Sequence, residues 1–461
     1  MQPRSGGAIP RRTFLRGAAA AGLGGTGALL AACGRSSPAA SSTTTTGAAG
    51  PTTRFRAGDR PFPSRAAGTD MLPEIRHIVV LMMENHSFDN YFGMLGRGDG
   101  FDLDARGRPR NANPGPDGTP VVAYPARSVC QADAHVSQDW AVSHQSWNHG
   151  RNDGFVRAKG TDPMAYFTGA DLPFYYSLGR TFPLCDRWFA STMAQTDPNR
   201  RFLIAGSAFG LVDDSFPVSA TRSNRPGGFG TVFDMLDHFG IPWLDYYSSL
   251  PTALLFPYAA AAVAPNLEKI DHFFSDAAAG TLPGFCLVEP DFGTASEENP
   301  QDVQNGQAFA ASVVNAVMAG PAWPDTVLIW VYDEHGGYYD HVPPQRAVPP
   351  DDIAPDVPAA ELDGDHYSWT GFRVPAVVVS PWAKRDYVSH VVHDHTSILR
   401  LLETKWNLPA LSNRDANASN LLDTLDLTAR RPPFLSPPTL AAAQAVSADQ
   451  VAACAALNQG G

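Results

Sequence analysis

The sequence has little charge for its length, and most of that charge is negative. Charged residues make up 17% of the 461 positions, and 46 Asp and Glu outnumber 34 Lys and Arg, for a formal net charge of −12. The first 32 residues contain four arginines and no acid, so the rest of the chain carries −16. Basic patches are what bind nucleic acid and anionic membrane surfaces. This balance therefore disfavours both as electrostatic partners. The 44% apolar content indicates a globular protein with a sizeable core.

The chain also has few cysteines, and none is spaced like the ligands of a zinc site. Four lie beyond residue 100: Cys130, Cys185, Cys286 and Cys454. Outside the cytoplasm four cysteines can pair in three ways, and the sequence does not choose among them. Because Cys286 lies within the apolar run 285–288, we expect it to be a buried core residue.

The apolar stretch near the N-terminus, residues 17–32, is too short and too weakly apolar to span a membrane. It follows the twin-arginine pattern RRTFL at 11–15 and ends in Leu-Ala-Ala-Cys33, which resembles the cleavage box of bacterial lipoproteins. We expect a signal peptide over residues 1–32, export by the twin-arginine translocation (Tat) machinery and lipidation of Cys33. An ordinary cleavable signal with a chance cysteine is the alternative. The mature protein would then be lipid-anchored on the outer face of the cell membrane, or secreted or in the cell wall.

Composition divides the remainder into a tether and one domain. Residues 33–70 are rich in Ser, Thr, Pro and Ala, which predicts a flexible tether with a span of roughly 30–35 Å. Residues 71–461 read as one continuous domain without internal repeats.

Unbroken apolar runs of strand length alternate with helical patterns in this domain. The expected strands are 75–83, 241–246, 285–288, 326–332 and 374–380, and the expected helices are 231–239, 307–318 and 396–406, with a surface helix after residue 439. Unbroken runs are typical of strands covered on both faces. The sequence therefore predicts an α/β fold with a mostly parallel sheet in a three-layer α/β/α sandwich.

Two of these strands end on acidic pairs. The run IRHIVVLMM leads into Glu84-Asn85, and TVLIWVY leads into Asp333-Glu334, followed by two glycines that allow close backbone approach. Ligands bind at the carboxyl ends of strands in open α/β sheets. Each turn by itself is most simply a polar cap on a buried strand. Together the four oxygen-bearing side chains predict a site for one divalent metal ion, with Ca, Mn, Fe and Zn all permitted.

Other polar segments supply residues for the chemistry. Thr196, in the polar loop Thr-Asp-Pro-Asn, carries a hydroxyl that becomes a useful nucleophile when a metal lowers its pKa, although the local pattern also fits a simple turn. Histidines gather at His144 with Asn148 nearby, at His335 after the second acidic pair, and at His395. Such clusters favour phosphate contacts or general acid catalysis, whereas any single histidine is more often structural.

Six ordered blocks resemble one family. They are IRHIVVLMMENHSFDNYFG, HQSWNHGRNDGF, MAYFTGADLPFYYSLGRTFPLCDRWFASTMAQTDPNR, GQAFAASVVNAVMAGPAWPDTVLIWVYDEHGGYYDHVPP, GFRVPAVVVSPW and DHTSILRLLETKW, and they span roughly residues 72–415. Together they resemble the bacterial phosphoesterase family of phospholipases C and related acid phosphatases, and the phospholipase C branch most closely.

The resemblance implies a core like that of alkaline phosphatase with one bound metal. It implies that Glu84, Asn85, Asp333 and Glu334 are the ligands and that Thr196 is the nucleophile that takes up the phosphoryl group. His144 and His395 are implied as contacts to the phosphate or the leaving group. Asn148 and His335 are further candidates for phosphate binding.

One element departs from the family pattern. Relatives usually carry Glu-His-Pro ahead of the second acidic strand, and this chain reads Glu298-Asn299-Pro300. Asn299 can hydrogen-bond a phosphate but cannot act as an acid near neutral pH.

The sequence as a whole predicts a phospholipase C that releases diacylglycerol and a phosphorylated headgroup through a phospho-threonine intermediate. Its substrate would be a phosphatidylcholine-like phospholipid or a small phosphoester. The alternatives are a phosphomonoesterase of acid phosphatase type, and a tethered binding protein without turnover, which Asn299 favours.

Overall fold

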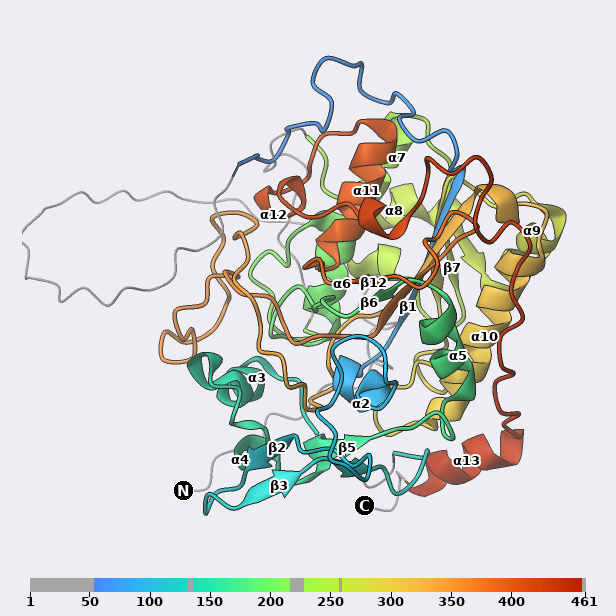
Figure 1. Ribbon diagram of the computed structural model, residues 1–461. Coiled ribbons are helices and arrows are strands. Elements are labelled where there is room, and N and C mark those ends of the chain that lie inside the picture. The colour runs from blue at the N-terminus through green and yellow to red at the C-terminus, as the bar shows by residue number, and fades with distance from the viewer. Residues whose placement is uncertain (1–53, 132–135, 216–227, 257–258, 458–461) are drawn as a thin grey trace, which may run out of the picture. The chain divides into compact units, whose positions relative to one another are not determined.

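The computed structural model describes residues 54–131, 136–215, 228–256 and 259–457 (Figure 1). The predicted signal peptide, Cys33 and the first part of the predicted tether lie outside these residues, so those assignments remain predictions. Within the described part of the chain, no helix combines the length and the apolar character that a membrane crossing needs.

An eight-stranded sheet forms the centre of the fold. In spatial order its strands are β12 (Val388–Ser389), β6 (Leu184–Cys185), β11 (Ala376–Val379), β10 (Thr326–Tyr332), β1 (His77–Met83), β9 (Phe285–Glu289), β7 (Trp243–Tyr247) and β8 (Leu267–Lys269). All neighbouring pairs are parallel except the two that involve β11. Two small sheets pair β2 (Ala112–Pro114) with β3 (Pro120–Val122) and β4 (Tyr124–Pro125) with β5 (Ala165–Tyr166).

Helices cover both faces of the large sheet. One group consists of α5 (Pro173–Thr181), α9 (Ile270–Ala279) and α10 (Val303–Ala319), and the other of α6 (Thr196–Ala205), α7 (Val232–His238) and α11 (Thr396–Trp406) (Figure 1). The remaining α-helices are α2 (Phe88–Phe92), α3 (Trp140–Trp147), α4 (Phe155–Lys159), α8 (Ala260–Val263), α12 (Asn413–Ala416) and α13 (Ala448–Leu457). The predicted mostly parallel sheet between two helical layers is therefore confirmed.

The two strands that carry the acidic pairs are central neighbours. β1 and β10 pair in parallel register from His77 with Thr326 to Met83 with Tyr332, and all seven residues of β10 are buried. Because the two strands end at the same level, the residues that follow them emerge side by side at one edge of the sheet.

β11 runs antiparallel to β10, and this changes which of its ends faces the site. Its carboxyl end lies at the opposite edge, while the residues before it, including Arg373, lie near the carboxyl end of β10. An apolar run does not encode strand direction, so this placement depends on tertiary structure.

Three strands of the large sheet escaped the sequence analysis because they are very short. β6 and β12 have two residues each and β8 has three, too few to show a periodic pattern. The predicted elements match observed ones with ends shifted by a few residues; β10 and α11 match in full. The surface helix expected at the chain end is α13, of whose residues only Cys454 is buried.

The segment 54–70, assigned to the tether from its composition, is hydrogen-bonded to the domain. Gly58 N donates to Ala410 O at 2.8 Å, and the Asn407 side chain bonds Phe62 at its backbone N (2.9 Å) and O (3.0 Å). The Lys405 ammonium pairs with Asp70 at 2.7 Å. The stretch therefore lies along the end of α11 and the residues after it.

The structure also decides the cysteine pairing. Cys130 and Cys454 form a disulfide, which attaches α13 to the segment before α3. Cys185 and Cys286 are buried free thiols, as the apolar surroundings of Cys286 predicted.

Candidate active site

The two acidic turns meet at the edge of the sheet. The backbone N of Asp333 donates to Met83 O at 3.1 Å, and Glu84, Asn85, Asp333 and Glu334 are all buried. Gly336 lies against the first turn so closely that an added Cβ would be 1.9 Å from Asn85 O, and its φ is +63°. Only glycine fits there, which explains the Gly-Gly that follows the second acidic pair.

Thr196 lies over this edge from the other side. It is the first residue of α6, and its Oγ1 donates to Asn85 Oδ1 at 3.3 Å. The sequence predicted a polar loop here, and that prediction was wrong: Thr-Asp-Pro-Asn forms the first turn of α6, where proline is tolerated because the first N–H groups have no intrahelical partner. Asn199 fixes the entry to the helix by bonding the backbone at Thr192 and Ala194.

Arg200 supplies a buried positive charge to the acidic turns. It lies on α6 four residues after Thr196, so the two side chains share one face of the helix. Its Nε donates to Asp333 Oδ2 at 2.9 Å, and its Nη2 is 3.7 Å from Glu84 Oε1. The same guanidinium therefore ties the helix that carries Thr196 to both acidic turns.

Burial raises the pKa values of the second acidic pair. The pKa of Asp333 rises to about 7, chiefly by desolvation, which the charge of Arg200 opposes. The pKa of Glu334 rises well above its usual value, by burial first and then through the charges of Asp333, Asp214 and Glu298. Anionic carboxylates at this edge are thus costly unless a cation balances them.

The residues at this edge fit a divalent cation. Glu334 Oε1 is a buried carboxylate oxygen without a hydrogen-bond partner among the described residues. The predicted ligands offer carboxylate and amide oxygens, the donors that hard and borderline metal ions prefer. Which of these side chains bind a metal remains a prediction.

Two histidines contact the second acidic pair. His395 Nε2 donates to the backbone O of Asp333 at 2.6 Å, and its Nδ1 accepts from Trp188 Nε1 at 3.4 Å. Burial lowers the pKa of His395 to about 4, so the ring is neutral and both nitrogens are engaged. His335 Nδ1 is 3.2 Å from Glu334 Oε2, and burial lowers its pKa as well.

Three other predicted residues have their closest contacts elsewhere. His144 bonds Trp140 O at 2.8 Å and is 3.3 Å from Asp365 Oδ2. Asn148 is the C-cap of α3 and donates to Asp153 at 2.5 Å. Asn299 accepts from the Tyr338 hydroxyl at 2.8 Å. None of these hydrogen bonds is to another predicted site residue, and their roles in catalysis stay predictions.

The sequence analysis missed Lys159. This lysine ends α4, donates to Gly337 O at 3.0 Å and lies over the Phe155 ring. Burial lowers its pKa to about 7, against the charges of Glu334 and Asp139. A single lysine at the end of a five-residue helix carries no sequence signal, so only the fold reveals its place beside the second acidic turn.

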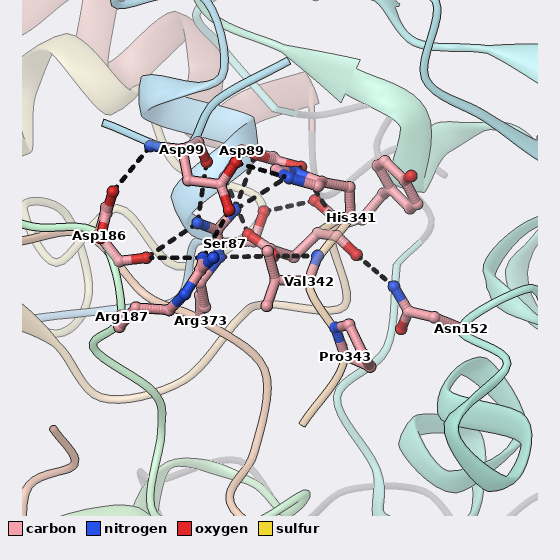
Figure 2. Close-up of polar contacts among 12 residues, drawn as sticks. Ser87, Asp89, Asp99, Asn152, Asp186, Arg187, His341, Val342, Pro343 and Arg373 are labelled. Carbon is pink, nitrogen blue, oxygen red and sulfur yellow. Dashed lines mark hydrogen bonds and ion pairs between the residues drawn. The ribbon is translucent and has the colours of Figure 1, made fainter. Parts of the chain in front are cut away.

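A second acidic cluster lies next to the first turn. Asp89, Asp340 and His341 bring ligand-type atoms within 4.8 Å of one another, a spacing that could hold a metal ion. Arg373 lies beside them, and Figure 2 shows it with Asp89 and His341. Its Nε is 2.8 Å from Asp340 Oδ1, and its Nη2 is 3.0 Å from Asp89 Oδ1. Arg373 pairs with both carboxylates, so the cluster joins the segments after β1 and β10 through buried ion pairs.

Comparison with known proteins identifies the family of this chain. The sequence profile of the Phosphoesterase family matches residues 75–409.

The chain belongs to the Phosphoesterase family.

Curated relatives confirm the resemblance seen in the sequence. The chain is 30% identical to phospholipase C B of Mycobacterium tuberculosis, covering 85% of this chain and 84% of the relative. It is 28% identical to the non-hemolytic phospholipase C of Pseudomonas aeruginosa (82% and 61% covered) and 29% identical to non-specific phospholipase C6 of Arabidopsis thaliana (76% and 72%). A solved structure of an alkaline phosphatase superfamily protein from Vibrio parahaemolyticus aligns over 81% of this chain and 74% of its own, at a TM-score of 0.37 and 11% identity, too distant to argue from.

Proposed function

We propose that this protein is a metal-dependent phosphodiester hydrolase of phospholipase C type, acting on phosphatidylcholine-like phospholipids. The hydrogen bond from the Thr196 hydroxyl to Asn85, beside the carboxylates of the two acidic turns, is the observation that carries the proposal. It places a nucleophile-type hydroxyl against the predicted metal ligands. The names of the relatives support the same activity.

In this proposal four residues bind the metal and Thr196 is the nucleophile. Glu84, Asn85, Asp333 and Glu334 would hold one divalent ion, Ca, Mn, Fe or Zn, which would lower the pKa of the nearby hydroxyl. Thr196 Oγ1 would bond to phosphorus as the bond from phosphorus to the diacylglycerol oxygen breaks, and diacylglycerol would leave with a proton. Water would then hydrolyse the threonine phosphoester, releasing the phosphorylated headgroup and regenerating the hydroxyl.

Two exposed carboxylates bonded to the residues that flank Thr196 support a diester over a monoester. Gln195 bonds the Asp139 side chain, and Asp214 Oδ1 accepts from the backbone N of Asp197 at 2.7 Å. Exposed carboxylates therefore border the nucleophile, and they repel the dianion of a phosphomonoester more strongly than a zwitterionic diester such as a choline phospholipid. A phosphomonoesterase of acid phosphatase type is the second candidate, because the same nucleophile and ligands would serve it.

Hydrolysis of p-nitrophenyl phosphorylcholine and p-nitrophenyl phosphate tests the proposal. Thr196→Ala should reduce diester turnover at least about 1,000-fold, whereas Thr196→Ser, which keeps a hydroxyl, should retain much of it. A chelator should abolish the wild-type activity, and added divalent metal should restore it. Hydrolysis of the monoester alone would indicate the phosphatase instead. Metal binding without turnover on either substrate would indicate a binding protein and implicate Asn299.

We further propose that the protein is exported by the Tat pathway and anchored through lipidated Cys33, near its lipid substrate. The RRTFL and Leu-Ala-Ala-Cys patterns support this. Labelling with a radioactive fatty acid should mark the wild-type protein and spare Cys33→Ser. Equal labelling of both proteins would refute the anchor.

A further inference from the structure

The loop that precedes Asn299 contains a fully buried carboxyl group. Glu297 is 0% exposed and follows β9 by eight residues. Its backbone φ is +76°, a left-handed conformation that costs energy for any residue with a Cβ. Gly306 of α10 lies so close that an added Cβ would be 2.1 Å from Glu297 Cγ, so the helix leaves room for this side chain only by having a glycine there.

Three buried phenols hydrogen-bond this carboxyl group. Tyr91 of α2 donates to Oε2 at 2.5 Å, Tyr175 of α5 donates to Oε1 at 2.6 Å, and Tyr332 donates to Oε2. Tyr332 is the last residue of β10, directly before Asp333. The carboxyl group therefore fixes the end of the strand that delivers the second acidic pair.

The backbone beside Glu297 fixes the first acidic pair in the same way. Glu84 N donates to Ser296 O at 2.9 Å, and His86 Nε2 donates to Glu297 O at 3.0 Å. Gln131 Nε2 donates to the same carbonyl at 2.8 Å. The residues on both sides of Asn85 are thus hydrogen-bonded to the short segment 296–297.

Stability alone does not explain a carboxyl group in this position. Burial raises the pKa of Glu297 to about 8, and the hydrogen bonds from the three phenols only partly oppose this. Buried charged or polar groups can often be replaced by apolar side chains of similar size at little cost in stability. An apolar side chain, however, cannot accept hydrogen bonds from three hydroxyls, and so it cannot fix the distances between the three elements that carry them.

We infer that Glu297 is a positioning residue that sets the distance between the Glu84-Asn85 turn and the Asp333-Glu334 turn. The inference rests on the proposed metal site, because the two turns supply its ligands. Displacing one turn by a fraction of an ångström would disturb the binding of a metal ion, since its ligands must lie within a few tenths of an ångström of fixed distances.

Two tyrosines offer a matched pair of variants. Tyr332→Phe and Tyr175→Phe each remove one hydroxyl from the same carboxyl group and leave two, and both side chains are fully buried. Tyr332 adjoins Asp333, whereas α5 carries none of the predicted site residues. A purely structural role predicts equal effects of the two substitutions, and a positioning role predicts an effect on the site from Tyr332→Phe alone.

Manganese(II) titration of the full chain, together with thermal unfolding and diester kinetics, separates these cases. We expect Tyr332→Phe to weaken manganese binding at least about tenfold and to lower kcat similarly with little change in KM. Tyr175→Phe should keep its manganese affinity and its kcat within about twofold of wild type. Its loss of thermal stability should be similar to that of Tyr332→Phe. Equal manganese affinities in the two variants would overturn the inference.

A second comparison covers the case in which Tyr332→Phe does not fold. Glu297→Gln should weaken manganese binding, whereas Glu403→Gln, at an equally buried carboxyl paired with Arg400 on α11, should not. Equal affinities in these two variants would also overturn the inference. If the wild-type chain neither binds manganese nor hydrolyses the diester, the proposed function fails and the positioning role fails with it.

Discussion

At the scale of single residues, two buried carboxylates of the acidic turns, those of Glu84 and Asp333, share the charge of Arg200. Arg200 is 2% exposed and contacts Asp333 at 2.9 Å and Glu84 at 3.7 Å, both fully buried. Its removal leaves these charges uncompensated in a medium that solvates them poorly.

Arg200→Met should therefore cost about 3–5 kcal/mol in the free energy of unfolding. The matched control is Arg187→Met, because Arg187 pairs with Asp99 at 2.6 Å with side chains that are 29% and 37% exposed. Such a partly solvated pair contributes below about 1 kcal/mol. Urea denaturation of both variants measures the difference, and equal losses would show that the charge of Arg200 is not needed for folding.

His341 makes stability depend on pH. Burial lowers its pKa, but the hydrogen bond and charge of Asp89 and the charge of Asp340 outweigh this, so the pKa is raised in the folded protein, while Arg373 opposes the increase. Asp99 also faces the ring, at 3.3 Å from Nε2. A raised pKa means that the folded protein holds the proton more tightly than the unfolded chain does.

The stabilisation is complete below the unfolded pKa of about 6.5 and is lost as the pH rises through the folded value. His341→Gln should cost about 2 kcal/mol at pH 6 and clearly less at pH 9. Urea denaturation of both proteins at the two pH values measures this. A loss that is the same at both would mean that the proton on His341 contributes nothing.

At the scale of elements, α13 is attached through one covalent bond. Its residues are mostly exposed, and Cys454 is the buried one, in the disulfide to Cys130. The other cysteine of the disulfide, Cys130, is followed by Gln131, whose side chain donates to the Glu297 carbonyl. Removing the bond should therefore loosen α13 first.

Cys454→Ser should make α13 sensitive to limited proteolysis and lower stability by about 2–4 kcal/mol. Cys286→Ser is the control, because that cysteine is a buried free thiol in β9 and its replacement leaves the disulfide intact. Mass spectrometry of the early cleavage products reports the result. Unchanged cleavage of α13 in Cys454→Ser would show that noncovalent contacts suffice to hold it.

At the scale of the whole molecule, the domain includes part of the segment that composition assigned to the tether. Asp70 pairs with Lys405, whose side chain is 2% exposed. The Asn407 side chain hydrogen-bonds both the backbone N and the backbone O of Phe62. Deleting these residues leaves buried polar groups of α11 and its C-cap without partners.

A protein that begins at Met71 should therefore be less stable than one that begins at Pro51, by about 1–3 kcal/mol. Thermal unfolding of the two truncated proteins gives the comparison. A third protein with Phe62→Ala in the longer form separates side-chain packing from hydrogen bonding, since the Asn407 bonds are to backbone atoms. Equal unfolding temperatures for the two truncated proteins would mean that residues 54–70 belong to the tether and not to the domain.

The sequence by itself determined the central elements and the positions of the two acidic turns along the chain. Strands buried on both faces must be almost entirely apolar. The unbroken apolar runs therefore identified β1 and β10, together with the acidic pairs that follow them. It could not give the direction of β11, the short strands β6, β8 and β12, or the pairing of Cys130 with Cys454, because none of these leaves a local pattern.

Only the tertiary structure decided which side chains meet. Arg200, Lys159 and Glu297 are single polar residues in separate elements, and nothing in their local sequence indicates burial against the acidic turns. His144 and Asn148 lie in the block HQSWNHGRNDGF, which suggested that they belong to the site. Their hydrogen bonds, however, are to other parts of the fold. Apolar periodicity records how each element faces the core, whereas polar contacts between elements depend on register, strand direction and loop path, which become fixed only when the chain is folded.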